Sequence, residues 1–183
     1  MTKPLSVGAN SGNPPASVRF FALVILCSAF SISAHAQTLI VALGSSSVAA
    51  SQAWPAQLEG MLKAKGYNVR VKNAGISGDT TSGILHRLVF AVPSRTKIVI
   101  LDMLGPYYNY LKTTAASPAR GHAEIEEIQA RLKSRGIIII PWSTRPPVSL
   151  RQADKKHPTA EGHKLIAEQL MPRVIDALQS LGG

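Results

Sequence analysis

Short apolar runs alternate along this chain with longer segments in which apolar residues recur at helical spacing. The continuous runs are typical of strands covered on both faces of a sheet, and they occupy residues 38–43, 67–71, 97–101 and 137–140. The amphipathic segments predict helices, at residues 51–65, 79–88, 117–135 and 159–181. Strands that alternate with helices predict an α/β fold, a three-layer α/β/α sandwich with a central parallel sheet.

Residues with known preferences for helix ends agree with this assignment. Pro55 suits the first turn of its helix and Gly66 follows as a stop, because proline needs no N–H donor there and glycine tolerates the conformation that ends a helix. Asp79 is expected to cap the next helix. Trp54 and Met61 fall at core positions. On the helix at 117–135, three acidic residues are expected to face water: Glu124, Glu126 and Glu127.

The loops that follow the predicted strands are expected to meet. In open α/β sheets, ligands bind in the crevice at the carboxyl ends of the strands. The sequence therefore predicts a binding site built from the loops at residues 45–50, 74–78, 105–116 and 144–157.

The first 36 residues have the pattern of a secretory signal. Lys3 and Arg19 precede an apolar run at residues 20–32, and the run is followed by Ala34-His35-Ala36, as at a signal-peptide cleavage site. A membrane anchor would need about 20 apolar residues, and a buried helix is the other alternative. We expect a signal peptide at 1–36, a single domain at 37–183, and a periplasmic or secreted protein.

Composition narrows the chemistry of this domain. Residues 37–183 contain no cysteine, which excludes disulfides, metal-thiolate sites and a cysteine nucleophile. They hold 18 basic and 10 acidic residues, a formal net charge of +8, which could favour anionic partners. The basic residues are scattered, so a solvated basic surface is the simpler interpretation. No nucleic-acid-binding signature is present, and no metal or cofactor is expected.

Three short motifs in the expected loops carry chemistry. Ser46 lies in Gly-Ser-Ser-Ser after the first strand, where a tight turn exposes a hydroxyl. Asp154 stands three residues before His157, a spacing at which a carboxylate can orient an imidazole toward a serine. Gly78 precedes a helix and can present a backbone N–H to an oxyanion. Taken singly, each motif is also compatible with an ordinary turn.

Taken together and in this order, the motifs resemble those of the SGNH (GDSL-type) hydrolase superfamily, and most of all its small bacterial lysophospholipase- and thioesterase-like esterases. The resemblance rests on Asn-Ala-Gly-Ile-Ser-Gly-Asp-Thr-Thr at 73–81 and Asp-x-x-His-Pro-Thr-x-Glu-Gly-His at 154–163, and it covers residues 38–181. It implies a flavodoxin-like sheet, Ser46 as nucleophile, His157 as general base and Asp154 as its partner. It also implies oxyanion donors at the N–H groups of Ser46 and Gly78.

The chain departs from the family pattern in two places. Ser45 stands where the family has aspartate, which leaves the triad intact. The family's Gly-x-Asn-Asp block, whose asparagine completes the oxyanion hole, has no clean counterpart in Asp-Met-Leu-Gly-Pro-Tyr-Tyr-Asn-Tyr at 102–110. Asn109 is the best candidate for the third donor, and the hydroxyls of Tyr107 and Tyr108 are lesser ones. The span from Asn109 to Asp154 is short, so a β-α unit or a covering loop is expected to be missing.

The resemblance implies a serine esterase that forms an acyl-enzyme and acts on carboxylic esters, with thioesters or lysophospholipids as further substrates. The alternatives are a polysaccharide O-acetyl esterase and a catalytically degenerate binding protein of the same fold. We expect a small-molecule or lipid ester as the substrate, no nucleic acid, at most peripheral membrane contact, and a monomer. Four other residues are interpreted as structural or surface positions: His86, His122, His163 and Asp102.

Overall fold

A computed structural model describes residues 1–2, 36–50, 53–113 and 116–182 of the 183. The chain divides into a first unit, Met1–Ala34, and a folded unit, His35–Gly183. The expected signal peptide lies almost wholly outside the described residues. Within the residues that the structure describes, no helix is long and apolar enough to span a membrane.

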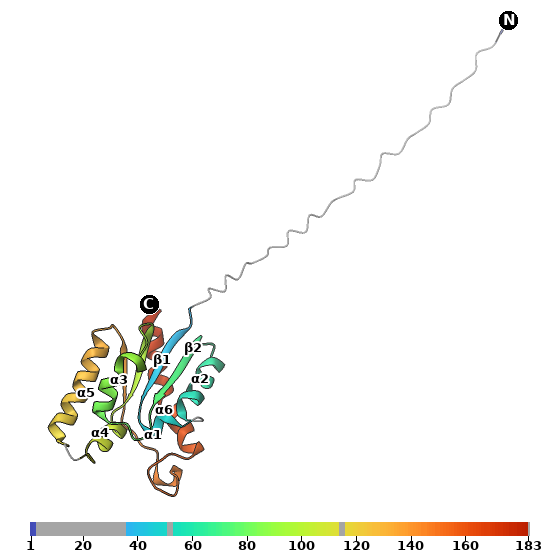
Figure 1. Cartoon of the computed structure of the whole chain (residues 1–183). Coiled ribbons are helices and arrows are strands. Elements are labelled where there is room, and N and C mark those ends of the chain that lie inside the picture. The colour runs from blue at the N-terminus through green and yellow to red at the C-terminus, as the bar shows by residue number, and fades with distance from the viewer. Residues whose placement is uncertain (3–35, 51–52, 114–115, 183) are drawn as a thin grey trace. The chain divides into compact units, whose positions relative to one another are not determined.

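The folded unit is built on a parallel sheet (Figure 1). Its strands run in the order β2-β1-β3-β4, all parallel, and comprise β1 (Thr38–Gly44), β2 (Val69–Gly75), β3 (Thr96–Asp102) and β4 (Ile138–Trp142). All four predicted strands exist. The second begins two residues later than its apolar run and continues through Asn73 and Ala74 to Gly75, so part of the expected loop is strand.

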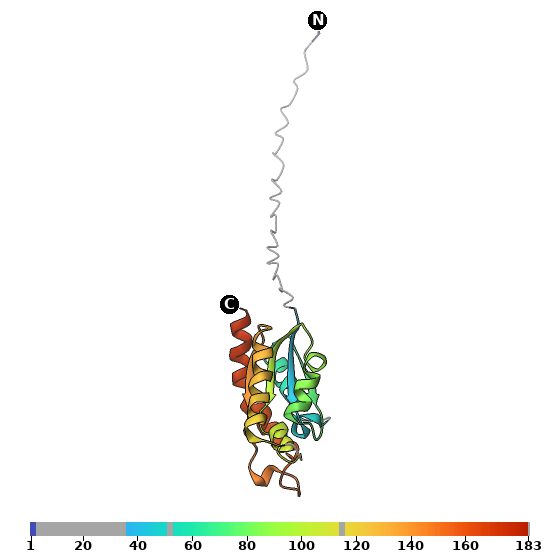
Figure 2. The same ribbon diagram turned by 60° about the vertical axis from the view of Figure 1, so that its left-hand side comes forward.

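Helices cover both faces of the sheet, as Figures 1 and 2 show. On one face, α2 (Trp54–Ala64) and α6 (Ala160–Leu181) pack against a core that includes Ile40, Ile98 and Ile100. On the other face, α3 (Thr81–Ala91) and α5 (Pro118–Lys133) pack against Val41 and Val99. Alternate residues of the central strands thus enter opposite cores, and the predicted three-layer sandwich is confirmed.

Short helices form at the carboxyl ends of the strands, where the sequence predicted loops. They are α1 (Ser46–Ala49), α4 (Gly105–Tyr110) and the 3₁₀ turn η1 (Val148–Leu150). Elements of one or two turns are too short to show a repeating apolar pattern. They carry the loops that build the site described below.

Two of the residue-level expectations for helices are wrong. Asp79 does not cap α3, because the helix begins later and the Thr80 hydroxyl accepts the N–H of Gly83 at 3.0 Å. Glu124 does not face water. It is buried between α3 and α5, where its carboxylate accepts hydrogen bonds from Thr81 and Ser82 at 2.6 and 2.7 Å.

Candidate active site

Ser46 lies where β1 ends and α1 begins. The carbonyl of Ser45 accepts the N–H groups of Val48 and Ala49, both at 3.0 Å, which closes the turn. Gly44 is required before it, because a Cβ at this position would lie 2.5 Å from the Cβ of Asp102 on the neighbouring strand. The turn therefore follows the strand immediately and leaves the Ser46 side chain partly exposed.

The structure joins Ser46, His157 and Asp154 in one array of hydrogen bonds. The Oγ of Ser46 lies 2.9 Å from Nε2 of His157, across 111 residues of sequence. The other ring nitrogen of His157, Nδ1, pairs with Oδ2 of Asp154. This is the arrangement in which a histidine can take the proton of a serine hydroxyl while a carboxylate fixes its tautomer.

Backbone donors hold the Asp154 carboxylate in its ionised form. Its Oδ1 accepts the N–H groups of His157 at 3.0 Å and Lys156 at 2.9 Å. These bonds, that of His157 first, together with the bond from the His157 ring hold the pKa of Asp154 well below its usual value. Asp154 therefore stays a hydrogen-bond acceptor for His157 throughout the neutral range.

The loop that carries Asp154 and His157 is closed on itself. The N–H of Gln152 donates to the carbonyl of His157 at 2.8 Å, and the N–H of Thr159 donates to Leu150 at 3.0 Å. Lys155 turns the chain with a φ of +57°, a left-handed conformation that few side chains adopt. The pair is thus positioned by local hydrogen bonds directly before α6.

Two backbone N–H groups at the cavity, those of Ser46 and Gly78, are available to a ligand. Gly78 turns the β2–α3 connection with a φ of +76°, a conformation suited to glycine. Among the described residues, the N–H groups of Ser46 and Gly78 donate no hydrogen bond, and both residues line the cavity at the triad. They are suited to the role of oxyanion donors that the family resemblance implies for them, and that role stays a prediction.

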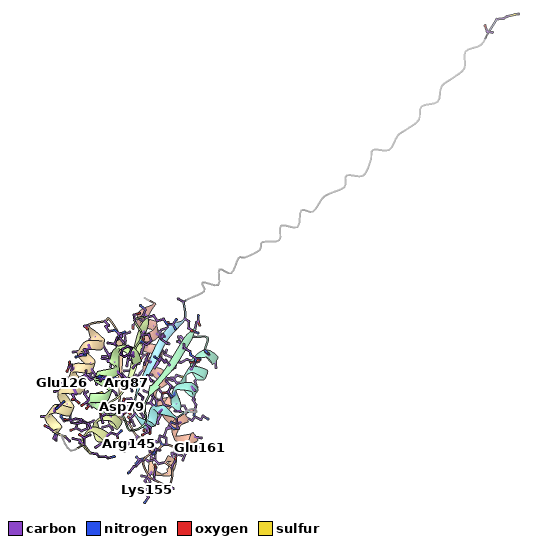
Figure 3. All side chains as sticks on the ribbon, viewed as in Figure 1. Asp79, Arg87, Glu126, Arg145, Lys155 and Glu161 are labelled. Carbon is purple, nitrogen blue, oxygen red and sulfur yellow. The ribbon has the colours of Figure 1, made fainter. Side chains whose placement is uncertain are left out.

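Arg87 fixes the segment around Gly78, and the sequence analysis overlooked it. From α3 its guanidinium donates to Asp79 Oδ2 at 2.7 Å and to the carbonyl of Ala74 at 2.9 Å. It also reaches the carbonyl of Gly44 at 3.3 Å. Figure 3 shows Arg87 and Asp79 beside each other. One side chain thus ties together the ends of β1, β2 and the connection after β2. Arg87 lies on the helix that follows this connection, and nothing in the sequence around it indicates that its side chain folds back to hold the connection.

The structure separates the three candidates for the third oxyanion donor. Asn109 lines the cavity, and its Nδ2 donates to the carbonyl of Asp79 at 2.9 Å. Tyr108 also lines the cavity. Tyr107 does not; its ring stacks on His122 with centroids 4.7 Å apart. An amide NH₂ has two N–H donors, so Asn109 can hold Asp79 with one and retain another.

Asp102 lies behind the serine loop, at the end of β3. It is 5% exposed, and its Oδ1 accepts the N–H groups of Leu104 at 3.1 Å and Gly105 at 2.9 Å. Burial raises the pKa of this carboxyl, against the opposing effect of the N–H donors. Its place at the start of α4 agrees with the structural role expected from the sequence.

The triad opens into a cavity of about 580 Å³. It lies at the carboxyl edge of the sheet, as predicted, and all four loop regions that were expected to meet contribute to it. The lining comprises Ser45, Ser46, Ser47, Ser77, Gly78, Leu104, Gly105, Tyr108, Asn109, Lys112, Arg145, Lys156 and His157. The sequence analysis assigned no role to Lys112, Arg145 or Lys156, because scattered basic residues give no indication of which ones the fold brings together.

Three other described histidines take no part in the hydrogen-bonded array of Ser46, His157 and Asp154. His86 and His122 are exposed on α3 and α5. His163 is buried on α6, where its Nδ1 accepts the N–H of Trp54 at 3.4 Å, and burial lowers its pKa. Among the described residues, no group of three or more histidine, cysteine or acidic side chains could hold a metal ion.

Sequence comparison identifies one curated relative. No family model matches the chain. Esterase TesA of Pseudomonas aeruginosa (strain PAO1) is 42% identical over 77 residues, which cover 39% of this chain and 38% of that protein. The matched segment thus spans about two fifths of the relative's length.

Solved structures share the fold over most of the chain. The crystal structure of TesA matches with a TM-score of 0.64 at 23% identity, covering 77% of this chain and 99% of that one. Esterase EstA from Pseudoalteromonas sp., inhibited by monoethylphosphonate, matches with a TM-score of 0.65 at 16% identity, covering 78% and 100%. AlinE4, an SGNH-hydrolase family esterase, matches with a TM-score of 0.55 at 27% identity, covering 80% and 99%.

Proposed function

We propose that this chain, whose fold and sequence are similar to those of an SGNH-hydrolase family esterase, is a serine esterase that hydrolyses carboxylic esters through an acyl-enzyme. One observation carries the proposal. The Ser46 hydroxyl lies 2.9 Å from an imidazole whose other nitrogen is paired with an ionised carboxylate. A serine is a weak nucleophile until an adjacent base can accept its proton, and His157 stands in that position.

In the proposed reaction, His157 accepts the Ser46 proton as Oγ attacks the ester carbonyl. The tetrahedral intermediate collapses when His157 returns the proton to the departing alcohol. Water then enters, His157 activates it, and its attack on the acyl-Ser46 ester releases the carboxylic acid and regenerates the hydroxyl. Asp154 stays ionised and stabilises the imidazolium in both steps.

The negative oxygen of the intermediate needs donors on the side of Ser46 opposite His157. We assign the N–H groups of Ser46 and Gly78 and the side-chain amide of Asn109 to this role. Their support is position: all three residues line the cavity that holds Ser46 Oγ. Preorganised donors of this kind strengthen as charge develops in the transition state.

The finer substrate class is part of the proposal. The acyl-enzyme route serves thioesters and lysophospholipids as well as simple esters, since only the leaving group differs. The cavity is open and large enough for a small acyl chain. The basic, cysteine-free domain is compatible with lysophospholipase and thioesterase activity outside the cytoplasm.

We further propose that the domain is exported and that it is a monomer. The support for export is the pattern of residues 1–36, whose Ala34-His35-Ala36 would be cleaved to leave Gln37 as the first residue. The enzyme would then act in the periplasm or outside the cell, with at most peripheral contact with membranes.

Substitutions in the triad test the esterase proposal. With 4-nitrophenyl butyrate as the substrate, Ser46→Ala should remove turnover, and His157→Ala nearly so. Asp154→Asn should lower kcat by about 10⁴-fold, because the imidazole loses the partner that fixes its tautomer. Initial rates on purified residues 37–183 measure each effect.

The neighbouring serine provides the matched control. Ser47→Ala removes the same hydroxyl group one residue along and should retain substantial activity. An inactive Ser47→Ala beside an active Ser46→Ala would show that the nucleophile had been assigned to the wrong serine. Equal activity of wild type and Ser46→Ala would refute Ser46 as the nucleophile, and a folded wild-type domain with no turnover would refute the esterase proposal.

A further inference from the structure

All the charged side chains that line the cavity are basic, and His157 is the only other titratable histidine, lysine, arginine or acidic residue in the lining. Lys112, Arg145 and Lys156 line the cavity, and no acidic residue does. They come from separate parts of the chain: Lys112 follows α4, Arg145 follows β4, and Lys156 lies in the triad loop, the loop that carries Asp154 and His157. The fold therefore gathers at one cavity three cations that the sequence disperses.

In the described part of the chain, these cations form no salt bridge. Among residues 36–50, 53–113 and 116–182, no carboxylate lies within 4.0 Å of the side-chain nitrogens of Lys112, Arg145 or Lys156. The nearby carboxylates are already engaged: Asp154 by His157 and by backbone donors, and Asp79 by Arg87. Asp102 interacts with Arg145 at longer range, but it is buried, and burial raises its pKa and so favours its neutral form.

Arg145 is held over the cavity by an aromatic ring. Its guanidinium carbon lies 5.1 Å from the ring centroid of Tyr108, the geometry of a cation–π contact. Both residues line the cavity, and Figure 3 places Arg145 toward the end of the domain that carries the triad loop and Lys155. A cation–π contact holds the guanidinium near the ring, and its N–H groups can bind a planar or tetrahedral oxyanion.

We propose that Lys112, Arg145 and Lys156 form an anion subsite beside the triad, and that the substrate is an ester bearing a phosphate or carboxylate group close to the scissile bond. The inference rests on the proposed esterase activity and adds the charge of the substrate to it. Three cations that line one cavity attract an anion more strongly than the same charges dispersed in water, because the protein lowers the local dielectric. The shared chemistry is an oxyanion; phosphate and carboxylate are its two sources.

Four butyrate esters that differ in charge test the subsite. They are 1-butyrylglycerol 3-phosphate, butyryloxyacetate, neutral monobutyrin and cationic butyrylcholine, and release of butyrate measures all four reactions alike. We expect kcat/KM to be at least about tenfold higher for an anionic ester than for monobutyrin, as one charge-assisted hydrogen bond would give, and lowest for butyrylcholine. The ratio of phosphate to carboxylate turnover identifies the source of the oxyanion.

Charge-removing variants locate the effect. Lys112→Gln and Arg145→Gln should each lower the anionic-to-neutral ratio, chiefly by raising KM for the anionic ester, since the contact is the same in ground and transition states. Lys133→Gln is the matched control. It removes one exposed charge from the last turn of α5, outside the cavity lining, and should preserve the ratio. The preference should also weaken as salt rises.

The outcomes separate the two proposals. Hydrolysis of monobutyrin at the same rate as the anionic esters, or faster, overturns the subsite and leaves the esterase proposal standing. A ratio that falls equally in Lys133→Gln overturns it too, because net charge alone would then explain the preference. A folded protein that hydrolyses none of the four esters overturns the esterase proposal, and the subsite with it.

Discussion

Ser46 and His157 meet only because the fold joins residues 111 positions apart. Two kinds of sequence information made this contact predictable. Asp154 and His157 are three residues apart, a local spacing that the loop converts directly into a hydrogen-bonded pair. Ser46 follows the first strand, and the carboxyl ends of parallel strands share one edge of the sheet. The charged residues around the cavity lack any such regularity.

Asn109 is the residue for which the sequence left most open. The structure puts it in the cavity wall and bonds its amide to the carbonyl of Asp79. An amide held in place at a cavity wall is suited to stabilise an oxyanion, because no reorganisation is needed when charge develops. Residues 102–110, which contain Asn109, have no clean counterpart in the family's Gly-x-Asn-Asp block, and the short helix α4 forms where a loop was expected.

We expect Asn109→Ala to lower kcat by about 10²–10³ with little change in KM, because loss of one oxyanion donor costs about that factor and acts mainly in the transition state. Steady-state kinetics with 4-nitrophenyl butyrate measure the change. Tyr107→Phe is the control, since that side chain stacks on His122 outside the cavity lining. A folded Asn109→Ala variant with kcat within a few-fold of wild type would exclude the amide as a donor.

At the scale of elements, α3 and α5 are joined by one buried carboxylate. Glu124 on α5 accepts hydrogen bonds from Thr81 and Ser82 in the first turn of α3 and from Arg120 on its own helix. Burial alone would raise the pKa of Glu124, but these donors outweigh it and leave the pKa below its ordinary value. The ionised form is therefore favoured by folding, and it fixes the start of α3 beside the Gly78 segment.

Glu124→Gln should destabilise the domain by about 1–3 kcal/mol at pH 7, the cost of weakening hydrogen bonds to a buried charged group. Because the pKa of Glu124 is lower in the folded state, its stabilisation is present above the pKa of the unfolded chain and is lost as pH falls through the folded value. The difference between wild type and variant should therefore shrink in acid. Urea unfolding at pH 7 and at pH 3.5 measures it.

Glu126 on the same helix provides the control. It is exposed (Figure 3), and Glu126→Gln should change the free energy of unfolding by less than about 0.5 kcal/mol at either pH. A Glu124→Gln variant as stable as wild type at pH 7 would contradict the role assigned to the carboxylate.

Helices and strands differed in how far sequence could predict them. Long helices and buried strands have a repeating apolar pattern, so all four of each were found in the right order. The short helices α1 and α4 have no such pattern. Glu124 was misassigned because its charge was taken to indicate exposure, whereas the buried partners that satisfy it come from another helix.

At the scale of the whole molecule, the layered fold was predictable and the electrostatics of its cavity were not. Alternation of strands with helices limits a chain of this length to few architectures. Which basic side chains meet at the cavity depends on loop conformations, as Lys112 and Arg145 illustrate. The described sheet has four strands, and the expectation of a missing β-α unit or covering loop between Asn109 and Asp154 stays a prediction.

Export is a prediction about the whole chain. Expressed from its first methionine in a Gram-negative host, the protein should be recovered from the periplasm or medium with Gln37 as its N-terminus, because Ala34 and Ala36 suit signal peptidase. N-terminal sequencing and intact mass give the answer. Ala36→Arg, which places a large charged residue at the cleavage site, should block processing. Recovery of the wild-type chain from the envelope with Met1 intact would show that the segment is retained.

The central claim is that Ser46 is a nucleophile activated by His157. The most direct measurement is reaction of purified residues 37–183 with a fluorophosphonate probe, followed by mass spectrometry of the labelled peptide. The account predicts one adduct, on Ser46, which is absent from Ser46→Ala and strongly slowed in His157→Ala. A folded protein that gives no adduct, or one modified at Ser45, Ser47 or another residue, would contradict it.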